Sequence, residues 1–229
     1  MFFKIFVLYT MFSLLSPPSD VVQCVEGLVT ESRMIEAGLT DIQSLDPTIR
    51  VQLAYATTDN FVGQNMYGSF DKAYFTHRFA EKIVRAQAEL QKMHPGYSLL
   101  ILDASRPQSV QKRMFDMVKG TAASAYVANG QRGGRHNYGV AADLTIVDET
   151  GTPLDMGTPF DYFGEAAHTD DEAHLKATGQ ITSEAYENRK LLRSVMSGAG
   201  LIVLPHEWWH YQEPVSMQQV RQNEKLLDF

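Results

Sequence analysis

Two short motifs rich in metal-binding side chains constrain the fold of this chain more than any other feature of its sequence. The first holds His136 and Asp143, seven positions apart, and the second holds Glu207 and His210, three positions apart. Imidazole nitrogens and carboxylate oxygens are zinc ligands, and a catalytic zinc keeps three protein ligands and an open fourth position. We therefore expect a fold that joins the two motifs, with His136, Asp143 and His210 on one zinc ion per chain.

Glu207 is expected to act as the general base beside this ion. Zinc lowers the pKa of a bound water from about 15.7 to about 7, and a carboxylate can take the proton and pass it to a leaving amine. The composition around Glu207, with two tryptophans and Tyr211, favours a strand. Residues i and i+3 of a regular strand point to opposite faces, so a bulge or twist is required for Glu207 and His210 to point the same way.

Taken singly, each motif has a simpler explanation, as a surface feature or as a satisfied polar group in the core. The same holds for Arg106, which follows an expected strand and precedes Pro107. A guanidinium held in place there suits the stabilisation of an oxyanion. From that residue alone, a surface ion pair is the simpler interpretation.

Composition narrows the function classes. The chain has 229 residues, 44% of them hydrophobic, and a net charge of −7. This length suits one domain with appendages. No block of basic residues is present, which argues against nucleic acid or an anionic membrane as the main partner.

The N-terminus predicts export to the periplasm or cell envelope. Residues 1–19 combine Lys4 with a short apolar run, which is typical of a signal peptide and too short to span a bilayer. No stable membrane span is expected after its removal. Residues 20–45 are expected to be a linker, and residues 46–229 the catalytic domain. Cys24 is expected to be a free thiol; lipid anchoring is the alternative, although Gln23 is not the small residue that usually precedes an acylated cysteine.

Hydrophobic periodicity predicts an α+β fold. Apolar runs or alternation indicate strands at residues 49–55, 98–102, 140–147 and 201–204. Helical spacing indicates helices from Thr76 to about residue 93, with Thr76 as N-cap, and at residues 109–119 and 183–196. Residues 155–182 are expected to form a long, partly irregular loop. The connections are too irregular for a doubly wound sheet, so a small mixed or antiparallel sheet flanked by helices is expected.

Several motifs, in order along the chain, resemble those of the zinc D-alanyl-D-alanine dipeptidases, the group that includes the vancomycin-resistance dipeptidase. The resemblance extends from about residue 51 to about residue 212. Each motif is weak alone, whereas the ordered set is specific. The motifs are Tyr55-Ala56-Thr57 with Asp59-Asn60-Phe61, Ser105-Arg106-Pro107-Gln108, His136-x-x-Gly139-x-Ala141-x-Asp143-Leu144-Thr145, Met156-Gly157, Phe160-Asp161 and Glu207-Trp208-Trp209-His210-Tyr211.

The resemblance implies the fold that this family shares with zinc DD-carboxypeptidases and the hedgehog signalling domain. It implies the zinc ligands and the base named above, and transition-state stabilisation by Arg106. It also implies that Asp161 receives the free ammonium of a dipeptide and that Tyr55 lines the pocket. One position departs from the pattern: Gly134 stands where the family often has a serine near the substrate's amino end, which puts the tightness of ammonium recognition in doubt.

Three hypotheses follow. The leading one is zinc-dependent hydrolysis of D-Ala-D-Ala, or a close D,D-dipeptide, with a small dipeptide as the partner. The second is a peptidoglycan DD- or LD-carboxypeptidase that acts on longer stem peptides; Asp161, as a receiver for a free amine, favours the dipeptide. The third is a zinc-stabilised binding module without turnover, against which the joint presence of Glu207 and Arg106 argues.

Overall fold

The centre of the molecule is a mixed sheet. The computed structural model describes residues 29–121, 124, 127 and 130–229. Within them, five strands form one sheet in the order β2-β4-β5-β7-β6. β2 pairs with β4 in parallel and the other neighbours are antiparallel. The strands are β2 (Arg50–Val51), β4 (Ser98–Asp103), β5 (Ala141–Val147), β6 (Ile202–Leu204) and β7 (Glu207–Gln212).

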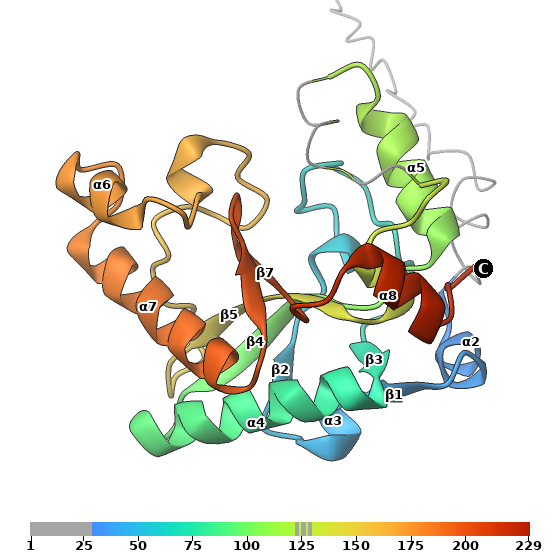
Figure 1. The fold of residues 1–229 in the computed structure, drawn as a ribbon, viewed down its shortest axis with the longest axis horizontal. Helices are drawn as coiled ribbons and strands as arrows, with labels where there is room; N and C mark the ends of the chain where they lie inside the picture. Colours follow the sequence, from blue (N-terminus) through green and yellow to red (C-terminus); the bar gives the residue numbers. More distant parts are fainter. Residues whose placement is uncertain (1–28, 122–123, 125–126, 128–129) are drawn as a thin grey trace, which may run out of the picture.

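Helices and loops cover the two faces of this sheet. Figure 1 shows α4 (His77–Met93) and α7 (Ser183–Gly198) beneath the sheet, and α5 (Gln108–Val118) and the long loops above it. This arrangement confirms the expected α+β class. The remaining elements are α2 (Glu31–Glu36), β1 (Leu39–Asp41), α3 (Ile42–Leu45), η1 (Ala54–Ala56), β3 (Tyr74–Thr76), η3 (Arg135–Tyr138), η4 (Glu165–Ala167), α6 (Glu172–Ala177) and α8 (Met217–Asn223).

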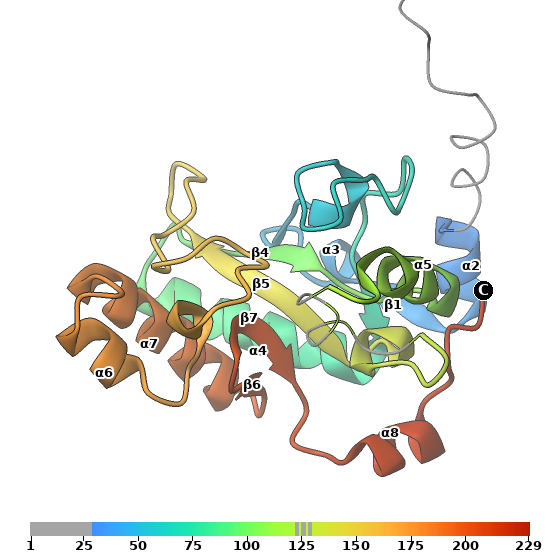
Figure 2. The ribbon, with the colours of Figure 1, turned by 90° about the horizontal axis from the view of Figure 1, so that it is seen from above.

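β5 is the central strand, and all seven of its residues are buried. Because side chains alternate along a strand, Ala142, Leu144 and Ile146 share one face and Asp143 points to the other. The three apolar residues belong to the main hydrophobic core. The packing of its neighbours therefore fixes Asp143 on the opposite face of β5, the strand drawn in yellow at the centre of the sheet in Figure 2.

α4 follows the periodicity of its sequence closely. The four apolar residues that share its predicted face are fully buried, and its bounds differ from the prediction by one residue at most. Thr76 occupies the N-cap position, but its side chain makes no capping hydrogen bond. Instead its Oγ1 is buried without a hydrogen-bond partner among the described residues. The buried residues are Phe79, Ala80, Ile83, Ala86, Gln87 and Leu90.

Three sequence-based expectations need correction. The described part of the linker expected at residues 20–45 forms α2, β1 and α3, and it buries Met34 and Ile42 completely. These two apolar side chains make the segment part of the domain. The strand expected at residues 49–55 contains two residues, after which the chain turns into η1 and directs Tyr55 inward. The loop expected at residues 155–182 contains η4 and α6.

The expected signal peptide and Cys24 lie outside the described residues. Among the residues that are described, no helix combines the length and the apolar character that crossing a membrane requires.

Gly139 joins the two halves of the first motif. It has φ of +68°, and a Cβ there would lie 2.9 Å from Leu39 Cδ2 and 3.1 Å from the backbone nitrogen of Thr76. Only glycine adopts this left-handed conformation without strain and leaves this space free. The turn brings η3, which carries His136, back onto the start of β5, which carries Asp143.

We expect Gly139→Ala to reduce the free energy of unfolding by about 2–5 kcal/mol, because left-handed strain and overpacking add. Gly179→Ala is the matched control, since Gly179 has φ of +75° and open space where the Cβ would lie. Its cost should be about 1–2 kcal/mol, from strain alone. Equal losses for the two variants in denaturant unfolding would contradict the close packing at Gly139.

Candidate functional site

Asp143 and His210 are directly opposite residues on two paired strands. The register of β5 and β7 pairs Asp143 with His210 and Ala142 with Tyr211. Side chains of directly opposite residues leave the same face with their Cβ atoms about 4.5–5.5 Å apart. His210 Nδ1 lies 3.0 Å from Asp143 Oδ1. The sheet itself therefore brings together two residues that are 67 positions apart in the sequence.

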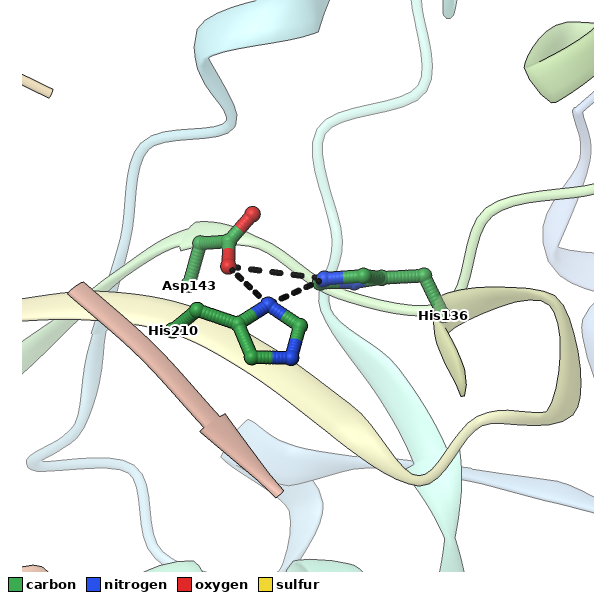
Figure 3. A group of neighbouring side chains, drawn as sticks. All are labelled: His136, Asp143 and His210. Atoms are coloured by element: carbon green, nitrogen blue, oxygen red, sulfur yellow. Dashed lines mark hydrogen bonds and ion pairs between the residues drawn. The ribbon is translucent and has the colours of Figure 1, made fainter. Parts of the chain in front are cut away.

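His136 completes the group from outside the sheet. It lies on η3, and its Nε2 is 3.2 Å from His210 Nδ1 and 3.4 Å from Asp143 Oδ1. Figure 3 shows the three side chains converging, each with one polar atom directed at a common point. All three residues are buried, and they form a group that could hold a metal ion. The structure thus brings together the three ligands that the sequence predicts.

Hydrogen bonds on the far side of each ring indicate which nitrogen is free to bind a metal. His136 Nδ1 lies 2.8 Å from the carbonyl oxygen of Ala104, and His210 Nε2 lies 3.2 Å from Gln212 Oε1. Both partners are oxygen atoms that accept, so His136 Nδ1 and His210 Nε2 are the protonated nitrogens in a neutral ring. The inner nitrogens, His136 Nε2 and His210 Nδ1, are then unprotonated and can each offer a lone pair. Three acceptors that face one another repel unless a cation lies between them, so the residues fit a metal ion.

Glu207 points to the same side as His210 because β7 is irregular. Val203 of β6 pairs with Tyr211, but the next residue, Leu204, pairs with Glu207 instead of His210. The extra residues of β7 form the bulge that the spacing of the two side chains requires. Glu207 Oε2 lies 3.8 Å from His210 Nδ1. Burial raises the pKa of the Glu207 carboxyl, which favours the uptake of a proton.

Arg106 is buried at the same site and is held by a carboxylate. Its Nε donates to Asp103 Oδ2 at 3.1 Å and its Nη1 donates to Gln111 Oε1 at 2.9 Å. Its Nη2 also donates to Asp103 Oδ2, and its Cζ lies 4.9 Å from the ring centroid of Tyr55. Although burial disfavours the charge, Asp103 holds the pKa of Arg106 well above its ordinary value. The surface ion pair considered for Arg106 is therefore wrong: its partner is buried.

Asp161 and Tyr55 meet at one end of the site. Tyr55 is buried, and its hydroxyl donates to Asp161 Oδ2 at 2.9 Å. Asp161 has φ of +59°, the left-handed conformation that costs a non-glycine residue on the order of 1 kcal/mol. Burial, and then the nearby Asp143, raises the pKa of Asp161 to about 8. A cationic partner would stabilise the ionised form of this carboxyl group and lower its pKa.

All seven predicted site residues line one cavity of about 270 Å³. This volume is near the lower limit of small-molecule sites, which are roughly 300–1,000 Å³. Gly134 also lines the cavity, without a side chain to offer. Aromatic rings contribute much of the remaining wall: Phe61, Phe163 and Trp209.

Three further residues, which the motifs did not indicate, support the site. Asp103 orients Arg106, Tyr67 donates to Asp103 Oδ1 at 2.6 Å, and Gln212 binds the outer nitrogen of His210. The contact of Gln212 with His210 could have been predicted from the sequence, because residues 210 and 212 of one strand share a face. No local sequence pattern could identify Tyr67, which lies 36 positions from Asp103.

Comparison with known proteins agrees with this geometry. The D-Ala-D-Ala dipeptidase model of the peptidase M15 family matches residues 35–229. The D-alanyl-D-alanine dipeptidase of Escherichia coli (strain K12) is 31% identical over 176 residues, which cover 77% of this chain and 84% of that protein. The enzyme of the same name from Enterococcus faecium is 30% identical over 197 residues, which cover 77% of this chain and 92% of that protein.

A solved structure of the LdcB LD-carboxypeptidase, described as revealing the molecular basis of peptidoglycan recognition, was also found. It aligns with 65% of this chain and 63% of its own, at 19% identity and a TM-score of 0.39.

The outer hydrogen bond of His210 generates a prediction. Gln212→Leu removes the partner of His210 Nε2 and should weaken metal binding about 10- to 100-fold, as losses of such supporting contacts do. Competition with a chromophoric chelator measures this affinity. Gln222→Leu is a control outside the cavity, since Gln222 is exposed on α8. Equal metal affinity of the Gln212→Leu variant and the unmodified protein would contradict the proposed orientation of the ring.

Proposed function

The chain belongs to the M15 family of metallopeptidases, the D-Ala-D-Ala dipeptidases, and on this basis we propose that it is a zinc enzyme that hydrolyses D-Ala-D-Ala or a close D,D-dipeptide. The observation that carries this proposal is the meeting, in one small cavity, of a three-ligand metal site with a buried carboxylate, a buried guanidinium and a second carboxylate. Each of these groups has a distinct role in the cleavage of a short peptide.

The spacing of the donor atoms supports zinc as the metal. A tetrahedral zinc ion with bonds of about 2.0–2.1 Å places its ligand atoms about 3.3 Å apart. The three donor atoms of His136, Asp143 and His210 lie 3.0, 3.2 and 3.4 Å from one another. When bound, zinc activates water and polarises the scissile carbonyl, and three protein ligands leave a position for this chemistry.

Glu207 is proposed to be the general base. Its carboxylate lies beside His210, and its raised pKa brings it closer to neutral pH than an exposed glutamate. It would accept a proton from the attacking water and deliver it to the leaving amine. Its partly buried position keeps bulk water from competing for this proton.

Arg106 is proposed to stabilise the oxyanion of the tetrahedral intermediate. Its guanidinium donates to Asp103 and Gln111, which hold it in place, and it lines the same cavity as the metal-binding residues. Because Asp103 fixes the guanidinium plane in advance, little reorganisation is required as the negative charge develops.

Asp161 is proposed to bind the free ammonium of the substrate. The carboxylate lines the same cavity as Glu207, and Tyr55 orients it through a hydrogen bond. Burial destabilises the ionised form of Asp161, and a bound ammonium group would stabilise it again through a charge-assisted hydrogen bond. A carboxylate that receives a free amine favours a dipeptide over a longer stem peptide. Gly134 contributes no hydroxyl to the binding of this ammonium.

We also propose that the protein is exported to the periplasm or the cell envelope. The support is the apolar run with Lys4 at the start of the sequence, which is typical of a signal peptide. D-Ala-D-Ala units of peptidoglycan would be accessible there. Expression of the full chain, followed by N-terminal sequencing of the exported protein, tests this proposal.

The reaction is tested with D-Ala-D-Ala and its N-acetylated form. The zinc-loaded protein should release D-alanine from the free dipeptide and not from the acetylated one. Glu207→Gln should lower kcat about 100- to 10,000-fold and retain its zinc. Cleavage of the acetylated dipeptide would instead support a carboxypeptidase, and cleavage of neither by the zinc-loaded protein would support the non-catalytic module.

Asp161→Asn tests ammonium recognition. Because a hydrogen bond to a charged group contributes about 1.5–3 kcal/mol, we expect KM for D-Ala-D-Ala to rise about 10- to 100-fold, with a smaller change in kcat. Asp170→Asn is the control, since this carboxylate is more than half exposed and lies nine residues further along. If Asp161→Asn has the same KM as the unmodified enzyme, Asp161 does not bind the ammonium.

A further inference from the structure

A single buried guanidinium from α7 holds both ends of the loop that carries Asp161. This loop, residues 156–168, is called the Asp161 loop below. Arg189 is only 2% exposed. Its Nε donates to the carbonyl oxygen of Met156 at 2.7 Å, its Nη2 to that of Ala166 at 2.8 Å and its Nη1 to that of His168 at 3.3 Å.

These contacts are specific to the shape of arginine. The guanidinium is a rigid planar fork with five donors, so it can hold three carbonyl groups in a fixed relative position. Glu172 Oε1 lies 3.7 Å from Arg189 Nη1 and offsets its charge without replacing the backbone contacts. Arg189 therefore acts mainly on the backbone of the loop, and it does not line the cavity of the site.

Side chains of β7 fix the middle of the same loop. Trp208 Nε1 donates to Thr158 Oγ1 at 2.8 Å, and the ring of Trp209 lies edge-on to Phe160, with centroids 5.4 Å apart. Arg189 Cζ lies 5.9 Å from the ring centroid of Trp208, so the guanidinium and the indole support the loop together. α7 and β7 thus form one support for the loop.

The conformation of Asp161 requires this support. A non-glycine residue with φ of +59° relaxes unless the surrounding structure determines its backbone. The loop approaches the rest of the site through Tyr55, whose hydroxyl binds the Asp161 carboxylate, and through Phe61, whose ring lies 5.1 Å from that of Phe163. Release of the loop ends would let the carboxylate move away from the cavity.

We propose that Arg189 is a positioning residue for substrate selection: by fixing both ends of the Asp161 loop, it holds the Asp161 carboxylate where the free ammonium of the substrate binds. This inference rests on the proposed function, in which Asp161 receives the ammonium. It assigns selectivity for a free amine partly to a side chain outside the cavity.

The test compares Arg189→Met and Arg189→Lys with Arg193→Met, each as the zinc-loaded enzyme. Arg193 is a matched control, because it lies one turn further along α7 and also pairs with Glu172. Arg189→Met should raise KM for D-Ala-D-Ala about 10-fold, since small displacements of a positioning group have large effects, with less change in kcat. Arg189→Lys should be intermediate because a lysine cannot hold all three carbonyls. Arg193→Met should keep the KM of the unmodified enzyme.

Hydrogen exchange supplies a second readout that does not depend on activity. Amides of the Asp161 loop should exchange faster in both Arg189 variants than in Arg193→Met. If Arg189→Met does not fold, Arg189→Lys carries the test. Unchanged KM and unchanged exchange in a folded Arg189 variant overturn the proposal.

Measurements in the Asp161→Asn background separate the positioning role of Arg189 from the ammonium-binding role of Asp161. There, Arg189→Met should raise KM no further, because the group that it positions is already absent. An equal rise in both backgrounds indicates a general structural role and overturns the proposal. If Asp161→Asn alone leaves KM unchanged, the ammonium role of Asp161 fails, whereas a raised KM in Asp161→Asn with none in Arg189→Met removes the positioning role alone.

Discussion

The cross-strand pairing of Asp143 with His210 is the constraint on which the rest of the site depends. It sets two metal-binding atoms 3.0 Å apart at the centre of a buried sheet. A shift of one residue in this register would direct one side chain into the core below. The turn at Gly139 then delivers His136, and the bulge in β7 delivers Glu207. A strand register, a glycine turn and a bulge are thus sufficient to assemble four functional groups.

The charges of the site fit the cations that we propose for it. Asp143, Asp161 and Glu207 line one small, largely buried cavity, and Asp103 lies directly behind it, where Arg106 balances its charge. Burial raises the pKa values of Glu207 and Asp161. A metal ion beside Asp143 and a substrate ammonium beside Asp161 would each stabilise the charged form of the carboxyl group that it contacts.

The sequence was sufficient for the parts of the structure that follow from periodicity and motif order. The helix α4 and the strands β4 and β5 were predicted, and all seven predicted site residues are among those that line the cavity. The packing of residues 31–45 against the domain was not predicted, because these short elements have weak periodicity and join the core only through contacts with distant parts of the chain. The same applies to Asp103 and Arg189, whose functions arise from hydrogen bonds that no local pattern encodes. A bulge or twist near Glu207 was predicted from the spacing of Glu207 and His210. Its position could be known only from the pairing of β7 with β6.

The central claim is that His136, Asp143 and His210 bind one zinc ion. Anomalous diffraction at the zinc absorption edge, from crystals of the zinc-loaded protein, tests this claim most directly. One peak per chain, bonded to the two inner imidazole nitrogens and to Asp143 at about 2.0–2.2 Å, is the expected result. A zinc peak elsewhere, or none at these three residues in protein that hydrolyses D-Ala-D-Ala, would contradict it.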